Sequence, residues 1–412
     1  MYKMVAKERT SAESKAQRHK VAKAQSVKGR KHALSAVEGW QGHKVTPAPS
    51  VPLCLCASVP LYRSCSVPLL MRLCLAVLVL LASCAGCARN RGALFFPPDA
   101  LVVWPEPPEQ PRIRYLGTLS TQADLKQEAS WTEGFGELLF GKREIGVLVA
   151  PYAVAIDTDS RLYVTDAAGA VVHIFDLKSR RYRQFADMIG PEKLAKPVGL
   201  IVVGDWVYVV DSKLRKVCVF DKNGRFMFSF GGDLFARPSG IAYSQADKTV
   251  YVADTAGHTI YVFTGSGKFV RKIGARGVGP GMFNFPTHLW VDAKGALYVS
   301  DTLNYRVQVF ARSGQFLRSF GQQGDRPGYF AHPCGVATDS FGNIYVTDRQ
   351  FENVQIFNPQ GEVLMAFGQE GTAPGQFWLP AGILVDDGNR IYVADSFNKR
   401  IQIFELLEKV EK

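Results

Sequence analysis

Short runs in which hydrophobic and polar residues alternate recur along most of the chain after residue 147. In residues 343–368, three such runs end at Asp348, Phe357 and Phe367, and Gly361 lies in one of the turns between them. Alternation with a period of two predicts half-buried β-strands, and Asp, Asn, Pro and Gly between the runs predict tight turns. The pattern therefore predicts a succession of short antiparallel strands.

This three-strand pattern belongs to a longer unit that occurs six times at fixed offsets. In each unit a tyrosine is followed by aspartate three residues later and by phenylalanine twelve residues later, and a proline precedes the tyrosine by 11 to 13 residues. A period near 45 with four strands per unit is typical of a β-propeller. We predict an all-β fold, a six-bladed propeller of four-stranded blades spanning residues 148–409. The tyrosines are Tyr163, Tyr208, Tyr251, Tyr298, Tyr345 and Tyr392.

The sixth unit lacks its fourth strand, because the sequence ends at residue 412 before that strand would be complete. Residues 113–117 resemble residues 317–321, which form the predicted fourth strand of unit four. We therefore expect the N-terminal strand to complete the last blade and close the ring, which removes an exposed sheet edge. Residues 112–147 are predicted to contain this closing strand and a helical insert.

Positive charge is concentrated at the start of the chain. The net charge is +12, and residues 1–83 contain 13 Lys and Arg against 3 Glu, so the remaining residues carry only +2. A near-neutral propeller argues against nucleic-acid binding, which needs a clustered basic face. Residues 1–70 show no persistent strand or helix period. We interpret them as a disordered basic extension, or as a non-native one if translation begins at Met71 rather than Met1.

Residues 71–84 have the features of an export signal. Arg72 precedes about ten apolar residues, which are too few to span a bilayer, and small residues follow. Residues 81–84, Leu-Ala-Ser-Cys, resemble the lipobox of bacterial lipoproteins, which implies acylation of Cys84; an ordinary signal peptide or an uncleaved anchor is the alternative. Ala85 rather than Asp follows, which by the same resemblance favours the outer membrane, facing the periplasm. Prolines in residues 85–111 predict an extended tether.

The repeat blocks Phe-x-x-Pro-x-Gly-Ile, Tyr-Val-x-Asp and Gln-Val/Ile-Phe resemble NHL repeats. Units four to six match best, and units one and two depart most, with Ala153 where most later units carry Gly. The resemblance implies a six-bladed propeller. Members of that family include binding modules, RNA-binding domains and a zinc lyase that uses three histidines from different blades. The histidines of these repeats do not occupy three equivalent connector positions, so we predict no metal and no cofactor.

Candidate site residues are those that depart from the repeat. His288 replaces the glycine of Pro-x-Gly near the expected channel mouth, and Cys334 occupies the x position of the next unit. The six repeated aspartates are expected to accept turn amides in every blade. Aromatic and basic residues in the connectors and the second-to-third-strand turns predict a binding rim, although ordinary packing between loops would use the same residues. The predicted rim comprises His288, Tyr305, Arg349, Phe351, Trp378 and Phe397.

These features predict a membrane-tethered, extracytoplasmic binding or scaffold module that is monomeric and not an enzyme, with a protein or small molecule as its partner. The alternative is a periplasmic hydrolase or lyase with its site at the channel mouth near His288. No Gly-x-Ser-x-Gly motif and no phosphate-binding loop opening a helix occur in the sequence.

Overall fold

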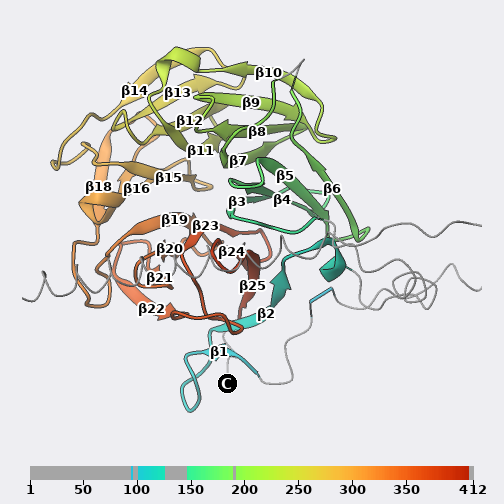
Figure 1. The fold of residues 1–412 in the computed structure, drawn as a ribbon. Coiled ribbons are helices and arrows are strands. Elements are labelled where there is room, and N and C mark those ends of the chain that lie inside the picture. Colours follow the sequence, from blue (N-terminus) through green and yellow to red (C-terminus); the bar gives the residue numbers. More distant parts are fainter. Residues whose placement is uncertain (1–93, 96–100, 126–145, 189–191, 408–412) are drawn as a thin grey trace, which may run out of the picture. The chain divides into compact units, whose positions relative to one another are not determined.

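The computed structural model describes residues 94–95, 101–125, 146–188 and 192–407. These residues form six antiparallel sheets arranged around a central axis (Figure 1). Each sheet is one blade, and its first strand lies innermost. The predicted all-β fold, a six-bladed propeller of four-stranded blades, is confirmed.

The first three blades follow the predicted repeat closely. Blade one consists of β3 (Pro151–Ile156), β4 (Arg161–Asp166), β5 (Val171–Asp176) and β6 (Arg181–Phe185). Blade two consists of β7 (Pro197–Val203), β8 (Trp206–Asp211), β9 (Lys216–Asp221) and β10 (Phe226–Phe230). Blade three consists of β11 (Pro238–Ser244), β12 (Thr249–Asp254), β13 (Thr259–Thr264) and β14 (Phe269–Ile273).

Blades four and five have the same strand order. Blade four consists of β15 (Pro286–Val291), β16 (Leu297–Asp301), β17 (Arg306–Phe310) and β18 (Phe316–Phe320). Blade five consists of β19 (Pro333–Thr338), β20 (Ile344–Asp348), β21 (Asn353–Phe357) and β22 (Val363–Phe367). Three short 3-10 helices accompany the described strands: η2 (Gln122–Leu125), η3 (Gly232–Leu234) and η4 (Thr302–Asn304).

Blade six contains strands from both ends of the propeller. Its sheet order is β1-β2-β25-β24-β23, with β23 (Pro380–Val385), β24 (Arg390–Asp395), β25 (Arg400–Leu406) and the closing strand β2 (Ile113–Leu119). The predicted closure is therefore confirmed. A short fifth strand, β1 (Val103–Trp104), pairs with β2 inside the segment predicted as a Pro-rich tether. Trp104 packs its ring 5.6 Å from Phe367, so this part of the segment is docked on the propeller.

The repeated residues explain how each blade holds its shape. In blade five, Asp348 accepts hydrogen bonds from the backbone amides of Ala331 (2.8 Å) and Phe351 (3.1 Å). These bonds join the connector before β19 to the turn after β20. The Tyr345 hydroxyl donates to Asp339 across 3.1 Å, in the turn before β20. Burial of the repeated aspartate is favourable only because its oxygens are satisfied in this way. The aspartates serve the blades, as predicted.

The hydrophobic core lies between neighbouring blades rather than within one sheet. Phe357 of blade five packs against Phe320 of blade four, with ring centroids 4.8 Å apart, and also contacts Phe330 in the connector between them. Each blade thus buries one face on the blade before it and the other on the blade after it. The alternating strand pattern in the sequence reflects these two packed faces.

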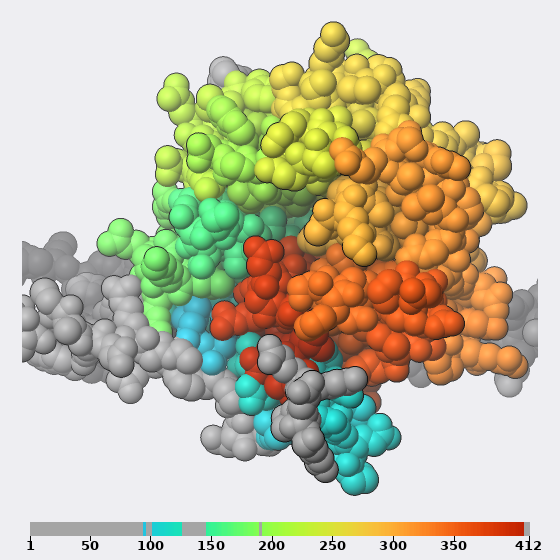
Figure 2. All heavy atoms as spheres, turned by 180° about the vertical axis from the view of Figure 1, so that it is seen from behind, coloured from blue at the N-terminus to red at the C-terminus, as the bar shows by residue number. Residues whose placement is uncertain are grey.

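The innermost strands of adjacent blades contact one another all around the ring, and β23 of blade six contacts β3 of blade one. Figure 2 shows that the blades follow one another in sequence order, with the first blade beside the last. Close approach explains the glycine of the Pro-x-Gly motif. A Cβ at Gly335 would lie 2.5 Å from the carbonyl oxygen of Ala381 in the next blade.

Several predicted features lie outside the described residues: the 1–70 extension, the 71–84 signal segment with the proposed lipidation site Cys84, and most of the helical insert. Within the described ranges, no helix has the length and apolar character needed to cross a membrane.

Candidate functional site at the central channel

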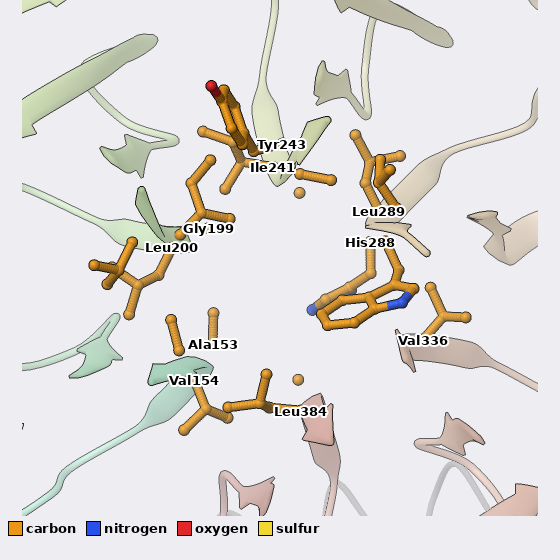
Figure 3. A pocket seen from close by; sticks show the side chains of 18 of the residues that line it. Ala153, Val154, Gly199, Leu200, Ile241, Tyr243, His288, Leu289, Val336 and Leu384 are labelled. Atoms are coloured by element: carbon orange, nitrogen blue, oxygen red, sulfur yellow. The ribbon is translucent and has the colours of Figure 1, made fainter. Parts of the chain in front are cut away.

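The innermost strands enclose a channel pocket of about 410 Å³. Most of its lining side chains are apolar, such as Val154, Leu200, Ile241 and Leu384 around the axis (Figure 3), but polar atoms contribute to the exposed wall about as much as apolar ones. The lining extends to Gln245, an exposed residue in the turn after β11. The pocket therefore reaches solvent on the face formed by the turns between first and second strands, which we call the turn face.

The other end of the pocket lies toward the connector face, which is formed by the connectors between blades and the turns after second strands. His288 lines the pocket at this end and extends its ring into the channel (Figure 3). The ring stacks on Tyr152, with centroids 5.3 Å apart and planes inclined by 20°. Tyr152 belongs to blade one and His288 to blade four, which are opposite each other in a ring of six. The stack therefore crosses the channel and closes it.

His288 can occupy the channel because it replaces a motif glycine. The equivalent positions in blades two, three, five and six are Gly199, Gly240, Gly335 and Gly382. Blade one has Ala153 there, beside Tyr152. Both departures from the motif glycine thus fall on the two opposite blades that form the closure.

A buried thiol completes the closed end. Cys334 is 1% exposed, and its Sγ lies 3.5 Å from Nδ1 of His288. The Tyr152 hydroxyl also lies close enough to the Cys334 thiol for each group to affect the pKa of the other. Polar atoms from three blades therefore meet at the closed end of the channel.

The groups at the closed end are uncharged near neutral pH. Burial, reinforced by electrostatic interaction with Arg349 and His332, lowers the pKa of His288 to about 3. Burial raises the pKa of the Cys334 thiol to about 11, although Arg349 opposes this. Burial also raises the pKa of Tyr152. The closed end is a neutral hydrogen-bonding cluster, and Cys334 lacks the thiolate character of a nucleophile.

One atom of this cluster has no hydrogen-bond partner among the described residues. His288 is 9% exposed, and its Nε2 is buried and unpaired. An unpaired buried polar atom costs free energy, and such atoms are uncommon in native proteins. Because Nε2 has almost no accessible surface, it does not face the open part of the channel.

The predicted rim residues occupy different environments. His288 lies inside the channel rather than on an exposed rim. Arg349 is half-buried in the turn after β20, and its positive charge lies near His288, His332 and Cys334. Tyr305 and Phe351 are half-buried: Tyr305 ends η4 and packs against the core between blades four and five, and Phe351 donates its backbone amide to Asp348.

Trp378 and Phe397 form an exposed aromatic pair on the connector face of blade six. They are 40% and 54% exposed, and their ring centroids lie 4.1 Å apart. The Phe397 amide donates to the Trp378 carbonyl at 3.1 Å, so the backbone fixes the pair. The structure thus brings together His288 with Arg349, and Trp378 with Phe397.

Two other histidines have local structural partners, whereas Nδ1 of His332 is buried without a hydrogen-bond partner among the described residues. His173 Nδ1 lies 2.8 Å from the Tyr182 hydroxyl, and His258 Nδ1 accepts the amide of Phe285 at 3.2 Å. Across the described part of the chain, no group of three or more His, Cys, Asp or Glu residues is placed to hold a metal ion.

Comparison with known proteins supports the fold. A family model described as a 6-bladed beta-propeller matches residues 234–297 and 336–411, about a third of the chain. No match was found among curated proteins. The NHL identity suggested by the sequence remains a prediction.

Solved structures share the fold at low sequence identity. A protein of unknown function from Bacteroides thetaiotaomicron is 16% identical, with a TM-score of 0.52, over 63% of this chain and 70% of its own. A gluconolactonase from Xanthomonas campestris is 15% identical, with a TM-score of 0.50, over 63% and 87%. An auxiliary nutrient binding protein from Bacteroides thetaiotaomicron is 13% identical, with a TM-score of 0.50, over 63% and 70%.

The prediction that the protein is not an enzyme is therefore corrected. Structures with this fold include a gluconolactonase as well as a binding protein. The sequence argument relied on the lack of a three-histidine zinc site and of motifs from other enzyme folds, whereas function depends on the site that a fold carries. The propeller is compatible with both catalysis and binding.

Proposed function

We propose that the central channel binds a small molecule with an apolar body. The observation that carries this proposal is the pocket that the inner strands enclose, which is lined mostly by apolar side chains and closed at one end by the stack of His288 on Tyr152. The volume of the channel pocket, about 410 Å³, lies within the usual range for small-molecule sites. Apolar side chains with a few polar groups among them are also typical of such sites.

The test is to fill the pocket without disturbing the blades. Val154→Phe adds a ring at a channel position, and Leu317→Phe adds the same ring type on β18, where Leu317 is 52% exposed. Binding of 4-tert-butylcyclohexanone is measured by ligand-observed NMR. We expect binding to the wild type and to Leu317→Phe, and at least tenfold weaker binding to Val154→Phe. Equal binding to all three proteins would contradict a channel site.

We also propose that a lipid on Cys84 attaches the propeller to a membrane outside the cytoplasm, with the outer membrane favoured by Ala85. The lipobox-like residues 81–84 and the preceding apolar run support this proposal. Labelling of cells with a palmitate analogue should mark the wild-type protein and leave Cys84→Ser unlabelled. Unlabelled wild-type protein in the soluble fraction would contradict it.

A second candidate function is recognition of a protein partner on the connector face. The exposed Trp378–Phe397 pair favours this function, because aromatic residues are enriched in the buried centre of protein–protein interfaces. Partners captured from native membranes should be lost with Trp378→Ala/Phe397→Ala. They should be retained with Phe341→Ala, which removes an aromatic that is 64% exposed on the turn face. Capture unaffected by the double substitution would contradict this candidate.

A further inference from the structure

At three junctions between blades, an arginine connects one blade to the next. It is the third residue of the fourth strand, and it donates to the turn between the third and fourth strands of the following blade. These arginines are Arg183 of blade one, Arg271 of blade three and Arg318 of blade four. Arg271, for example, donates to the carbonyl oxygen of Arg312 at 2.8 Å.

The junction between blades five and six lacks both the arginine and the turn. The third residue of β22 is Met365, which has no donor group. Blade six has no turn between its third and fourth strands, because β25 and β2 come from opposite ends of the propeller. Blade two also lacks the arginine and has Phe228 instead, but blade three retains the turn there. The closing junction is thus the place where both parts are missing, and a groove of about 1110 Å³ lies there.

Apolar side chains form most of this groove, which we call the closure groove. Ile356, Leu364 and Met365 line it from blade five, and Leu406 and Leu407 line it from blade six. Apolar atoms make up most of its exposed wall, whereas the wall of the central channel is about half polar. A large concave apolar surface favours a ligand with an apolar body.

The polar side chains of the closure groove are largely engaged with one another. Asn343 Nδ2 donates to Asp339 at 2.8 Å, and the Asn389 side chain bonds both the backbone amide and the hydroxyl of Ser340. A polypeptide in the groove would bury backbone N–H and C=O groups with few partners, which is unfavourable. A single hydrocarbon chain carries no such groups and therefore suits the groove better.

Two charged residues line the closure groove, and they differ in exposure. Arg112 is half-buried, whereas Glu109 is exposed. The backbone of Arg112 is fixed, because its amide donates to the Trp104 carbonyl at 2.6 Å and its carbonyl accepts the Leu407 amide at 2.7 Å. Its guanidinium has no hydrogen-bond or ion-pair partner among the described residues. Water screens an ion pair with a half-buried group less than one with an exposed group, so Arg112 favours an anionic ligand more strongly than Glu109 disfavours it.

We infer that the closure groove binds a fatty acid or a similar single-chain carboxylate. Its hydrocarbon chain lies along Leu364 and Met365, and its carboxylate pairs with Arg112. A planar guanidinium can hold a carboxylate through two parallel hydrogen bonds. This site is separate from the central channel, so the inference goes beyond the proposed channel function and does not depend on it.

Three probes with the same chain test the charge of the ligand: octanoate, 1-octanol and octylammonium, each titrated by calorimetry. We expect octanoate to bind the wild type at least fivefold more tightly than either of the others. Arg112→Gln should reduce this ratio to about one, and Arg326→Gln, which removes an exposed arginine from the connector before blade five, should preserve it. Absence of octanoate binding, equal affinities for octanoate and 1-octanol, or tightest binding of octylammonium would overturn the inference.

Two equivalent leucines test the location of the ligand. Leu364 and Leu317 are the second residues of β22 and β18 and are 56% and 52% exposed, but only Leu364 lines the closure groove. Leu364→Glu should weaken octanoate binding at least tenfold, whereas Leu317→Glu should change it less than twofold. Val154→Phe, in the central channel, should leave it unchanged. Weakening by Val154→Phe but not by Leu364→Glu would overturn this inference and leave the proposed channel function standing.

The remaining occupant to test is the chain itself, because residues 408–412 follow Leu407 directly. Truncation after Leu407 should leave octanoate affinity within about twofold of the wild type. A tenfold gain in affinity would mean that these residues compete for the closure groove, and it would overturn the inference of a fatty acid as its occupant.

Discussion

Substitution of Leu119 by alanine should destabilise the whole propeller, because this residue lies on the strand that closes the ring. Leu119 is on β2, opposite Ile401 of β25, and is 0% exposed. It packs in one cluster with Leu125 and Leu148, which connects blade six to blade one. Loss of its side chain therefore leaves a cavity at the junction where the two ends of the propeller meet.

The expected cost of Leu119→Ala is about 3 kcal/mol, a typical value for deletion of a buried leucine side chain. For a domain of this size, that corresponds to a fall in melting temperature of about 6–12 °C. The assay is urea unfolding followed by tryptophan fluorescence and circular dichroism. Leu317→Ala on β18 is the control, because this leucine is 52% exposed on the outermost strand of blade four, and its loss should cost less than about 0.5 kcal/mol.

Two results would refute this reasoning about closure. One is a loss of less than about 0.5 kcal/mol in Leu119→Ala, which would mean that β2 contributes little to stability. The other is a separate early transition that leaves the rest of the protein as stable as the wild type. That result would mean that β2 and blade six unfold independently of the ring.

Three further predictions concern the channel. Because the pKa of His288 is lowered in the folded state to about 3, the unfolded state takes up a proton first as the pH falls. The free energy of unfolding should therefore decrease between pH 6.5 and 3 by up to about 1.4 kcal/mol per pH unit. In urea titrations, His288→Phe should flatten this slope. Gly335→Ala should lower stability by about 1–3 kcal/mol in thermal melts, because the added Cβ would lie 2.5 Å from the Ala381 carbonyl oxygen. Gly388→Ala is the control and should cost less, because its nearest contact is at 3.3 Å. Equal losses in the two variants would contradict the argument from close approach. Cys334 should resist iodoacetamide until the protein unfolds, as measured by peptide mass spectrometry, because it is 1% exposed with a pKa raised to about 11; rapid labelling of native protein would contradict its burial.

The blades were predictable from the sequence because the residues that hold them are local and repeated. Tyr345, Asp348 and Phe357 lie within thirteen residues of one another, and the same chemistry recurs in every unit. The closing strand was also predictable, because 113–117 resembles the fourth strand of another unit. The short strand β1 was missed, since prolines around Trp104 favour extended backbone without indicating which sheet edge it pairs with.

The candidate site was only partly predictable. His288 attracted attention because it replaces a motif glycine, but its stack with Tyr152 depends on the ring placing blades one and four opposite each other. Nothing in the local sequence specifies that pairing, although Ala153 beside Tyr152 is the other departure from the motif glycine. The loss of charge on His288 was also not predictable, because it depends on burial, reinforced by the charge of Arg349.

The pairing of β2 with β25 also determines the order in which the molecule can be completed. Arg114 and Glu405 face each other across this pair and are separated by 291 positions in the chain. At ordinary rates of protein synthesis, about 5–20 residues per second, the second strand is made about 15–60 seconds after the first. Strand β2 is therefore without its partner β25 during this time. The ring can close only after β25 has been synthesised.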